Sequence, residues 1–158
     1  MTHLPTARPA RPSDLAGLLN LFRACEVSPP AEPGGHAERI WAEIGQRTGV
    51  TVFVSDAAAG LAATCMLITA PNLLRAGRGH AFLENVVTHP DLRGRGHGRA
   101  VVQAALDQAW SAGCFQVLLQ SGRTDVRVHR FYPGLGFRPG VRTAYAIVST
   151  ADPPIPSS

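Results

Sequence analysis

A glycine-rich turn lies between a strand-like segment and the longest helix-like segment of the chain. The turn, residues 93–98, reads Arg93-Gly94-Arg95-Gly96-His97-Gly98. Residues 81–88 before it are largely apolar, and residues 96–112 after it carry apolar side chains at helical spacing. Glycines let the backbone approach a ligand closely, and the first amides of a helix have no partner within that helix. The sequence therefore predicts an anion site at a helix N-terminus, where the arginines of the turn and Arg99 add positive charge.

This turn has two other interpretations. Three closely spaced glycines are also typical of a flexible loop that leads into a helix, and the residues by themselves leave that alternative open. A dinucleotide-binding fingerprint is excluded, because its order of glycines is absent and no acidic residue ends a following strand about 20 residues later.

The rest of the chain alternates between helical and strand-like patterns. Some segments repeat apolar residues at spacings of three and four, whereas others are short, partly β-branched runs bounded by glycine or proline. Residues 50–55 and 61–69 are joined by a short turn and are expected to pair as an antiparallel hairpin. We therefore expect a mixed α/β (α+β) domain, with helices at 14–25, 37–48, 96–112 and 126–133, and further strands at 81–88, at 115–120, around Phe137 and at 145–149.

All 15 basic residues are arginine, which excludes Schiff-base chemistry and any phosphate loop that depends on a lysine. The charge is uneven, because residues 75–142 hold ten arginines against four carboxylates, and this half of the chain attracts anions. Nucleic acid is not expected as the partner. The arginines are dispersed, and aromatic residues make up only 6% of the chain, too few for a base-stacking platform.

The length of 158 residues suits one domain, which we expect at 1–150, followed by a tail rich in proline and serine at 151–158. No apolar run approaches the roughly 20 residues of a membrane span, and the N-terminus lacks a signal-peptide pattern. We therefore expect a cytoplasmic protein with no membrane partner. The three cysteines match neither a disulfide framework nor a metal-binding pair, so we expect buried thiols and no metal site at Cys25, Cys65 and Cys114.

Three segments, taken in order, carry a recognisable combination. The turn has the order Arg, two residues, Gly, one residue, Gly; residues 82–90 before it read Phe-Leu-Glu-Asn-Val-Val-Thr-His-Pro, and residues 131–137 read Phe-Tyr-Pro-Gly-Leu-Gly-Phe. Together they resemble the pyrophosphate signature, the fourth strand and the late tyrosine element of the GNAT superfamily of acyl-CoA-dependent N-acetyltransferases. The resemblance implies a twisted mixed sheet with helices on both faces, whose central strands splay apart to admit the pantetheine arm of acetyl-CoA.

The resemblance also implies which residues meet acetyl-CoA. The pyrophosphate would lie at the turn beside Arg99, and the pantetheine arm would bond as a pseudo-strand to the backbone of Val86, Val87 and Thr88. An amide of the first two would also stabilise the oxyanion. Family members often place an asparagine seven residues before the tyrosine, where this chain has Asp125. An ionised carboxylate accepts a hydrogen bond but donates none, so Asp125 departs from the family pattern.

Two side chains are candidates for the chemistry. The resemblance implies that Glu84, the only carboxylate of its strand, is a general base that acts through water. An ordinary outward-facing glutamate is the alternative, and His129 and His80 are lower-ranked bases. Tyr132 matches the family position that supports the departing thiolate, and packing beside the neighbouring phenylalanines is its alternative.

The expected reaction is transfer of an acetyl group from acetyl-CoA to a primary amine, by direct attack in a ternary complex. A small-molecule amine is favoured, because the strand resembles that of relatives that act on small metabolites, amino sugars included. The alternatives are a catalytically silent CoA-binding or regulatory domain and a protein N-terminal or side-chain acetyltransferase; a homodimer is compatible with the resemblance. Residues 26–39, 70–80 and 138–143 would shape the acceptor site, and Arg75 and Arg78 either are solvated or bind an anionic group there.

Overall fold

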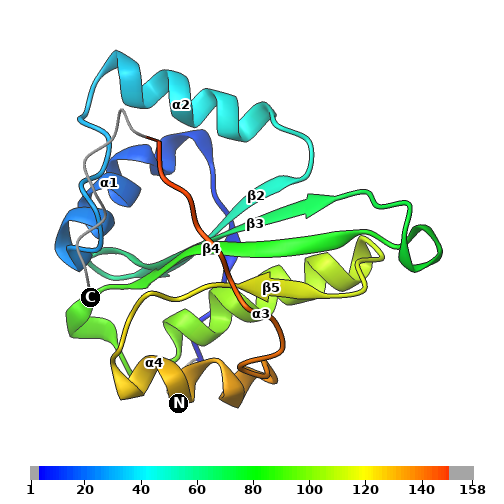
Figure 1. Ribbon diagram of the computed structural model, residues 1–158. Coiled ribbons are helices and arrows are strands. Elements are labelled where there is room, and N and C mark those ends of the chain that lie inside the picture. The colour runs from blue at the N-terminus through cyan, green and yellow to red at the C-terminus, as the bar shows by residue number, and fades with distance from the viewer. Residues whose placement is uncertain (1–3, 150–158) are drawn as a thin grey trace. The chain divides into compact units, whose positions relative to one another are not determined.

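The computed structural model describes residues 4–149, which form two units (Figure 1). The first unit ends at Leu119 and the second begins at Gln120. The predicted tail at 151–158 lies outside the described residues, and the boundary of the domain at 150 stays a prediction. Among residues 4–149, no helix has both the length and the apolar character needed to cross a bilayer.

The first unit is built on one sheet of β1 (Arg8–Pro9), β2 (Val50–Ala57), β3 (Gly60–Ala70), β4 (His80–Thr88) and β5 (Val117–Leu119). The strands lie in sequence order across the sheet. All neighbours are antiparallel except β4 and β5, which are parallel. The predicted hairpin is confirmed, since β2 pairs antiparallel with β3 from Val50 to Ala57.

Three helices of the first unit cover this sheet: α1 (Leu15–Cys25), α2 (Gly35–Gln46) and α3 (His97–Ser111). Figure 1 shows α1 and α2 on one face of the sheet and α3 on the other, which confirms the expected mixed sheet with helices on both faces. Val101, Val102 and Ala105 of α3 are completely buried, and α1 buries Leu18 and Leu21 on the opposite face. Each buried valine or leucine stabilises the fold by about 1.5–3 kcal/mol.

Strand β1 is a two-residue strand that the sequence does not predict. It contains Pro9 and is too short to show any period. Its Arg8 side chain forms ion pairs with Asp14 (2.7 Å) and with Asp56 (2.8 Å). These two contacts join β1 to the start of α1 and to the end of β2.

The second unit contains α4 (Val126–Phe131), followed by a 3-10 turn at Pro133–Leu135. The prediction of closing strands around Phe137 and at 145–149 is wrong, because residues 136–149 contain no strand. Strand-forming residues are favoured where a pleated surface is half buried against neighbours. Here the side chains find no such surface: Tyr145 is 91% exposed and Ile147 is 100% exposed.

Candidate active site

A β-bulge interrupts β4 at the segment expected to meet acetyl-CoA. Glu84 lies opposite Met66 and Val87 lies opposite Thr64, so two residues of β4, Asn85 and Val86, face a single residue of β3. Asn85 adopts a left-handed conformation (φ 52°), which asparagine tolerates better than most residues. Because of the extra residue, Glu84 and Val87 lie on the same face of the sheet.

The edge of β4 beyond Leu83 has no strand beside it within residues 4–149. Parallel pairing with β5 ends at Leu83 and Leu119. On the other edge, His89 N donates to Ala62 O of the neighbouring chain segment (2.8 Å). Amides of a strand alternate in direction, so the amide of Val87 points toward β3, whereas those of Val86 and Thr88 point to the edge without a strand.

Glu84 is exposed on the sheet face that α1 and α2 cover. Its cross-strand partner Met66 lies on that same face. Within residues 4–149, the side chain of Glu84 has no hydrogen-bond or ion-pair partner. A carboxylate in this setting is accessible to a water molecule or to an ammonium group.

The predicted turn does run from β4 into the N-terminus of α3. Gly94 and Gly96 both have positive φ, 74° and 94°, a region that glycine enters at little cost. Gly96 caps α3, and the first amide bonded within the helix is that of Ala100, which donates to Gly96 O (2.9 Å). The amides of Gly96, His97 and Gly98 therefore precede the hydrogen-bonded ladder of the helix.

The charge expected around this turn is present. Arg93 and Arg95 are exposed, and neither forms an ion pair with a carboxylate in the described part of the chain. The positive end of the α3 dipole lies at the same point. Turn, dipole and guanidinium groups together form a site that suits a phosphate or pyrophosphate.

His97 is held by a buried hydrogen-bond chain that the sequence did not reveal. Ser55 is completely buried, and its Oγ lies 2.8 Å from His97 Nδ1 and donates to Thr6 O at 2.8 Å. A hydroxyl has one proton, so the Ser55–Thr6 bond requires His97 to donate from Nδ1. Ser55 and His97 are distant in the chain, so no local pattern joins them. The one hint in the sequence is a serine within an otherwise apolar strand.

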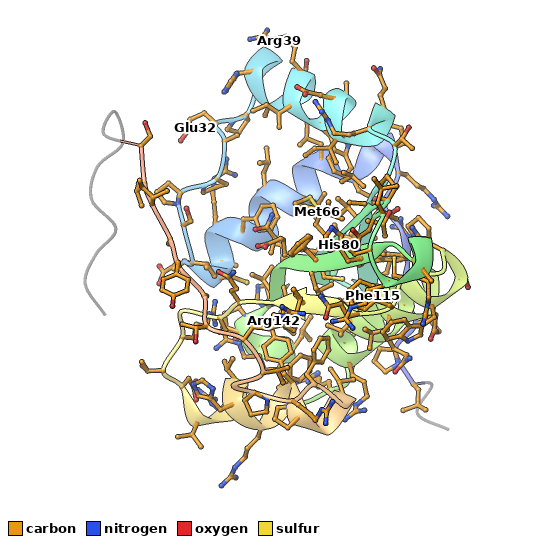
Figure 2. All side chains as sticks on the ribbon, turned by 45° about the vertical axis from the view of Figure 1, so that its right-hand side comes forward. Glu32, Arg39, Met66, His80, Phe115 and Arg142 are labelled. Carbon is orange, nitrogen blue, oxygen red and sulfur yellow. The ribbon has the colours of Figure 1, made fainter. Side chains whose placement is uncertain are left out.

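The other polar residues singled out in the first unit have packing partners. His80 contacts the ring of Phe82, with centroids 5.4 Å apart. The Arg75 guanidinium lies 5.2 Å from the centroid of Phe115, and Arg78 donates to Cys114 O (3.2 Å). Figure 2 labels His80 and Phe115 near one another in this region. Both arginines are also exposed, so a role in binding an anionic group of the acceptor stays a prediction.

The three cysteines are buried thiols, as expected. Cys65 donates to Val101 O (3.2 Å), and burial raises the pKa of its thiol to about 12. Burial also raises the pKa of Cys114, and nearby Arg78 opposes that effect. Cys25 donates to Thr88 O (3.5 Å). Thiols with raised pKa values supply almost no thiolate at neutral pH, so Cys65 and Cys114 are poor nucleophiles.

Three predicted residues belong to the second unit. Asp125 caps α4, because its carboxylate accepts from Arg127 N (2.9 Å) and forms an ion pair with the Arg127 side chain (3.0 Å). This carboxylate raises the pKa of Arg127. Tyr132 is half-buried, and its ring contacts Phe131 and Phe137 edge-on, with centroids 5.0 Å and 5.8 Å apart. His129 is exposed on α4.

Comparison with known families agrees with this geometry. Residues 15–137 match the family described as the Acetyltransferase (GNAT) family. The chain belongs to the GNAT family of acetyltransferases. The matched region of this GNAT chain runs from the first residue of α1 through the bulge and the turn to Phe137. The resemblance inferred from the three motifs is confirmed.

Individual relatives extend this result. A glucosamine 6-phosphate N-acetyltransferase of Trypanosoma brucei brucei is 31% identical over 128 residues, which cover 80% of this chain and 84% of the relative. A solved structure from Agrobacterium tumefaciens strain C58, described as an acetyltransferase, is 40% identical, with a TM-score of 0.84 over 91% of this chain and 99% of that one.

A third relative was solved with a CoA-containing ligand. The protein AAC(6')-Iy, in complex with a bisubstrate analogue of CoA and acetylneamine, shares the fold with a TM-score of 0.75 at 17% identity, over 94% of this chain and 99% of that one. Acetyl-CoA is the co-substrate of GNAT acetyltransferases. This GNAT chain is accordingly an acetyl-CoA-dependent N-acetyltransferase.

Proposed function

We propose that the protein transfers the acetyl group of acetyl-CoA to the primary amine of a small molecule, by direct attack within a ternary complex. The observation that carries the proposal is the edge of β4 that has no neighbouring strand within residues 4–149, together with an exposed carboxylate at Glu84 and an arginine-bearing helix N-terminus after Thr88. Relatives named for an amino sugar phosphate support a small amine as the acceptor.

The edge and the turn fit the two ends of an acyl-CoA. An extended arm with amide groups would bond to the backbone of Val86 and Thr88, whose amides point to the edge without a strand. The amides at the start of α3, with Arg93 and Arg95, would receive the pyrophosphate. Val87 and Asp125, which the resemblance also implied as contacts, direct their polar groups to β3 and to α4 respectively.

Glu84 would serve as the general base. An alkyl ammonium with a pKa of about 10.4 lies about 3.4 pKa units from neutral pH, so exposing its lone pair costs about 4.6 kcal/mol. A carboxylate that accepts this proton, directly or through water, lowers that barrier. Glu84 is accessible and has no competing partner among the described residues, which suits this role.

The amide of Val86 would stabilise the oxyanion, and Tyr132 would support the leaving thiolate. With a thiol pKa of about 8.5 and a phenol pKa of about 10, full proton transfer from the phenol to the departing thiolate is uphill by about 1.5 pKa units, or roughly 2 kcal/mol, so the hydroxyl would hydrogen-bond the thiolate rather than protonate it. Direct attack is favoured over an acyl-enzyme, because the buried Cys65 and Cys114 thiols have raised pKa values.

Release of free CoA from acetyl-CoA, followed across a panel of small primary amines and one N-terminal peptide, tests the proposal. We expect turnover with at least one small amine. Binding of acetyl-CoA without turnover of any acceptor would support the catalytically silent alternative. Turnover of the peptide alone would support a protein acetyltransferase.

A further inference from the structure

A cavity of about 180 Å³ lies between the sheet and the two helices that cover its Glu84 face. We call it the helix cavity. Leu18 and Phe22 of α1, Ile40 and Trp41 of α2 and Met66 of β3 line it, and the lining contains no charged side chain. Figure 2 shows Met66 between the sheet and these helices, whereas Arg39 lies on the outer side of α2.

The cavity exists because α2 stands away from the sheet. Ala37 is the only buried residue of this helix, and Ile40 remains 38% exposed although it belongs to the apolar face. The indole of Trp41 is fixed in place, because its Nε1 donates to Pro12 O (3.0 Å). The apolar face of α2 is thus held above a space that protein side chains do not fill.

This space is continuous with the reacting strand. Met66 lines the cavity and lies directly opposite Glu84, and Asn85 at the bulge also lines it. An amine placed at the Glu84 carboxylate therefore has its substituent on the sheet face that bounds the cavity. The negative charge of Glu84 complements an ammonium group beside the cavity, and the largely apolar lining complements an apolar group within it.

We propose that the helix cavity binds the apolar part of the acceptor, so that the substrate class is a primary amine bearing one aromatic ring or a branched alkyl chain. This inference rests on the proposed function. A carbon-lined cavity of about 150 Å³ in another protein holds benzene, so this volume suits a single ring. A sugar phosphate would bring a phosphate dianion, for which the lining supplies no cationic side chain.

Steady-state acetylation of 2-phenylethylamine, ethylamine and glucosamine 6-phosphate tests the inference. We expect kcat/KM for 2-phenylethylamine to exceed that for each of the other two at least tenfold. The variant Ala31→Trp places an indole at a lining position and should raise KM for 2-phenylethylamine at least tenfold, while acetyl-CoA affinity stays unchanged. Ala42→Trp, at an exposed position of α2 outside the lining, is the matched control and should behave as wild type.

A second variant keeps the inference testable if Ala31→Trp does not fold. Met66→Gln keeps the length of the side chain and places an amide in the lining, so it should weaken 2-phenylethylamine binding, measured by calorimetry in the presence of CoA, at least fivefold. A higher kcat/KM for glucosamine 6-phosphate, or unchanged KM and affinity in both variants, overturns the inference and leaves the proposed function intact. Acetyl-CoA binding with no acetylation of any amine overturns the proposed function and this inference with it.

Discussion

Glu84 carries its charge on an exposed strand position where the described chain offers no countercharge. If it removes the proton of the acceptor, Glu84→Gln should lower turnover by about 10²-fold at pH 7. The deficit should shrink toward pH 9.5, because the free amine then forms without help. Turnover of both proteins from pH 6 to pH 9.5 measures this. Glu38→Gln, an exposed glutamate of α2, is the charge-matched control, and a constant deficit across the range would assign Glu84 another role.

Tyr132 differs from a packing aromatic only in its hydroxyl. The variant Tyr132→Phe keeps the ring contacts with Phe131 and Phe137, so stability and acetyl-CoA affinity should stay near wild type. Loss of a hydrogen bond of about 1.5–3 kcal/mol to a developing thiolate should slow the chemical step roughly 10- to 150-fold. Single-turnover transfer at saturating acetyl-CoA measures that step. Tyr145→Phe, the other tyrosine of the chain, is the control, and a rate within twofold of wild type would leave Tyr132 a packing residue.

At the scale of elements, the Arg8 side chain adds ion pairs to the backbone pairing of β1 with β2, and its guanidinium holds the pKa of Asp14 below its ordinary value. A lowered pKa means that the pair stabilises the fold above the unfolded-state pKa near 3.9 and stops doing so as the pH falls through the folded-state pKa. Asp14→Asn should therefore cost about 1–2 kcal/mol at pH 7 and progressively less below pH 4. Urea unfolding of the wild type and the variant at a series of pH values tests whether the difference in their free energies of unfolding shrinks as the pH falls. The control Asp107→Asn, on the exposed side of α3, should show no such pH dependence in its difference from wild type.

Element types with a clear period were predictable, and features set by distant contacts were not. The turn and α3 follow from glycines and apolar spacing within one stretch of sequence. The pairing of Ser55 with His97 joins residues far apart in the chain, so no local pattern records it. The prediction of a closing strand at 145–149 was wrong for a related reason, because its residue types favour a strand only where a neighbouring strand is present to pair with it. Glu84 and Tyr132 came from a family resemblance, and their roles stay predictions.

At the scale of the whole molecule, binding of acetyl-CoA at the turn should raise the free energy of unfolding. Acetyl-CoA at 100 times its dissociation constant should add about 2.7 kcal/mol, or roughly 5–10 °C in melting temperature. Gly96→Glu puts a carboxylate at the cap of α3 and should abolish the shift. Gly96→Asn is the control, because asparagine tolerates the positive φ of 94° and adds no charge. An unchanged melting shift in the glutamate variant would remove the pyrophosphate assignment.

The extra residue in β4 bears on how such a protein can gain or lose activity over evolutionary time. On either side of Asn85 and Val86 the strand pairs regularly with β3. A gene that lost the Asn85 codon would encode a strand whose remaining residues still match their partners, with Val87 still packed against Leu21 and Cys25. Such a descendant would fold, but β4 would lose the local bend that a bulge introduces between Glu84 and the Val86 amide. A three-nucleotide deletion could thus separate the scaffold from its chemistry, and the reverse insertion could restore it.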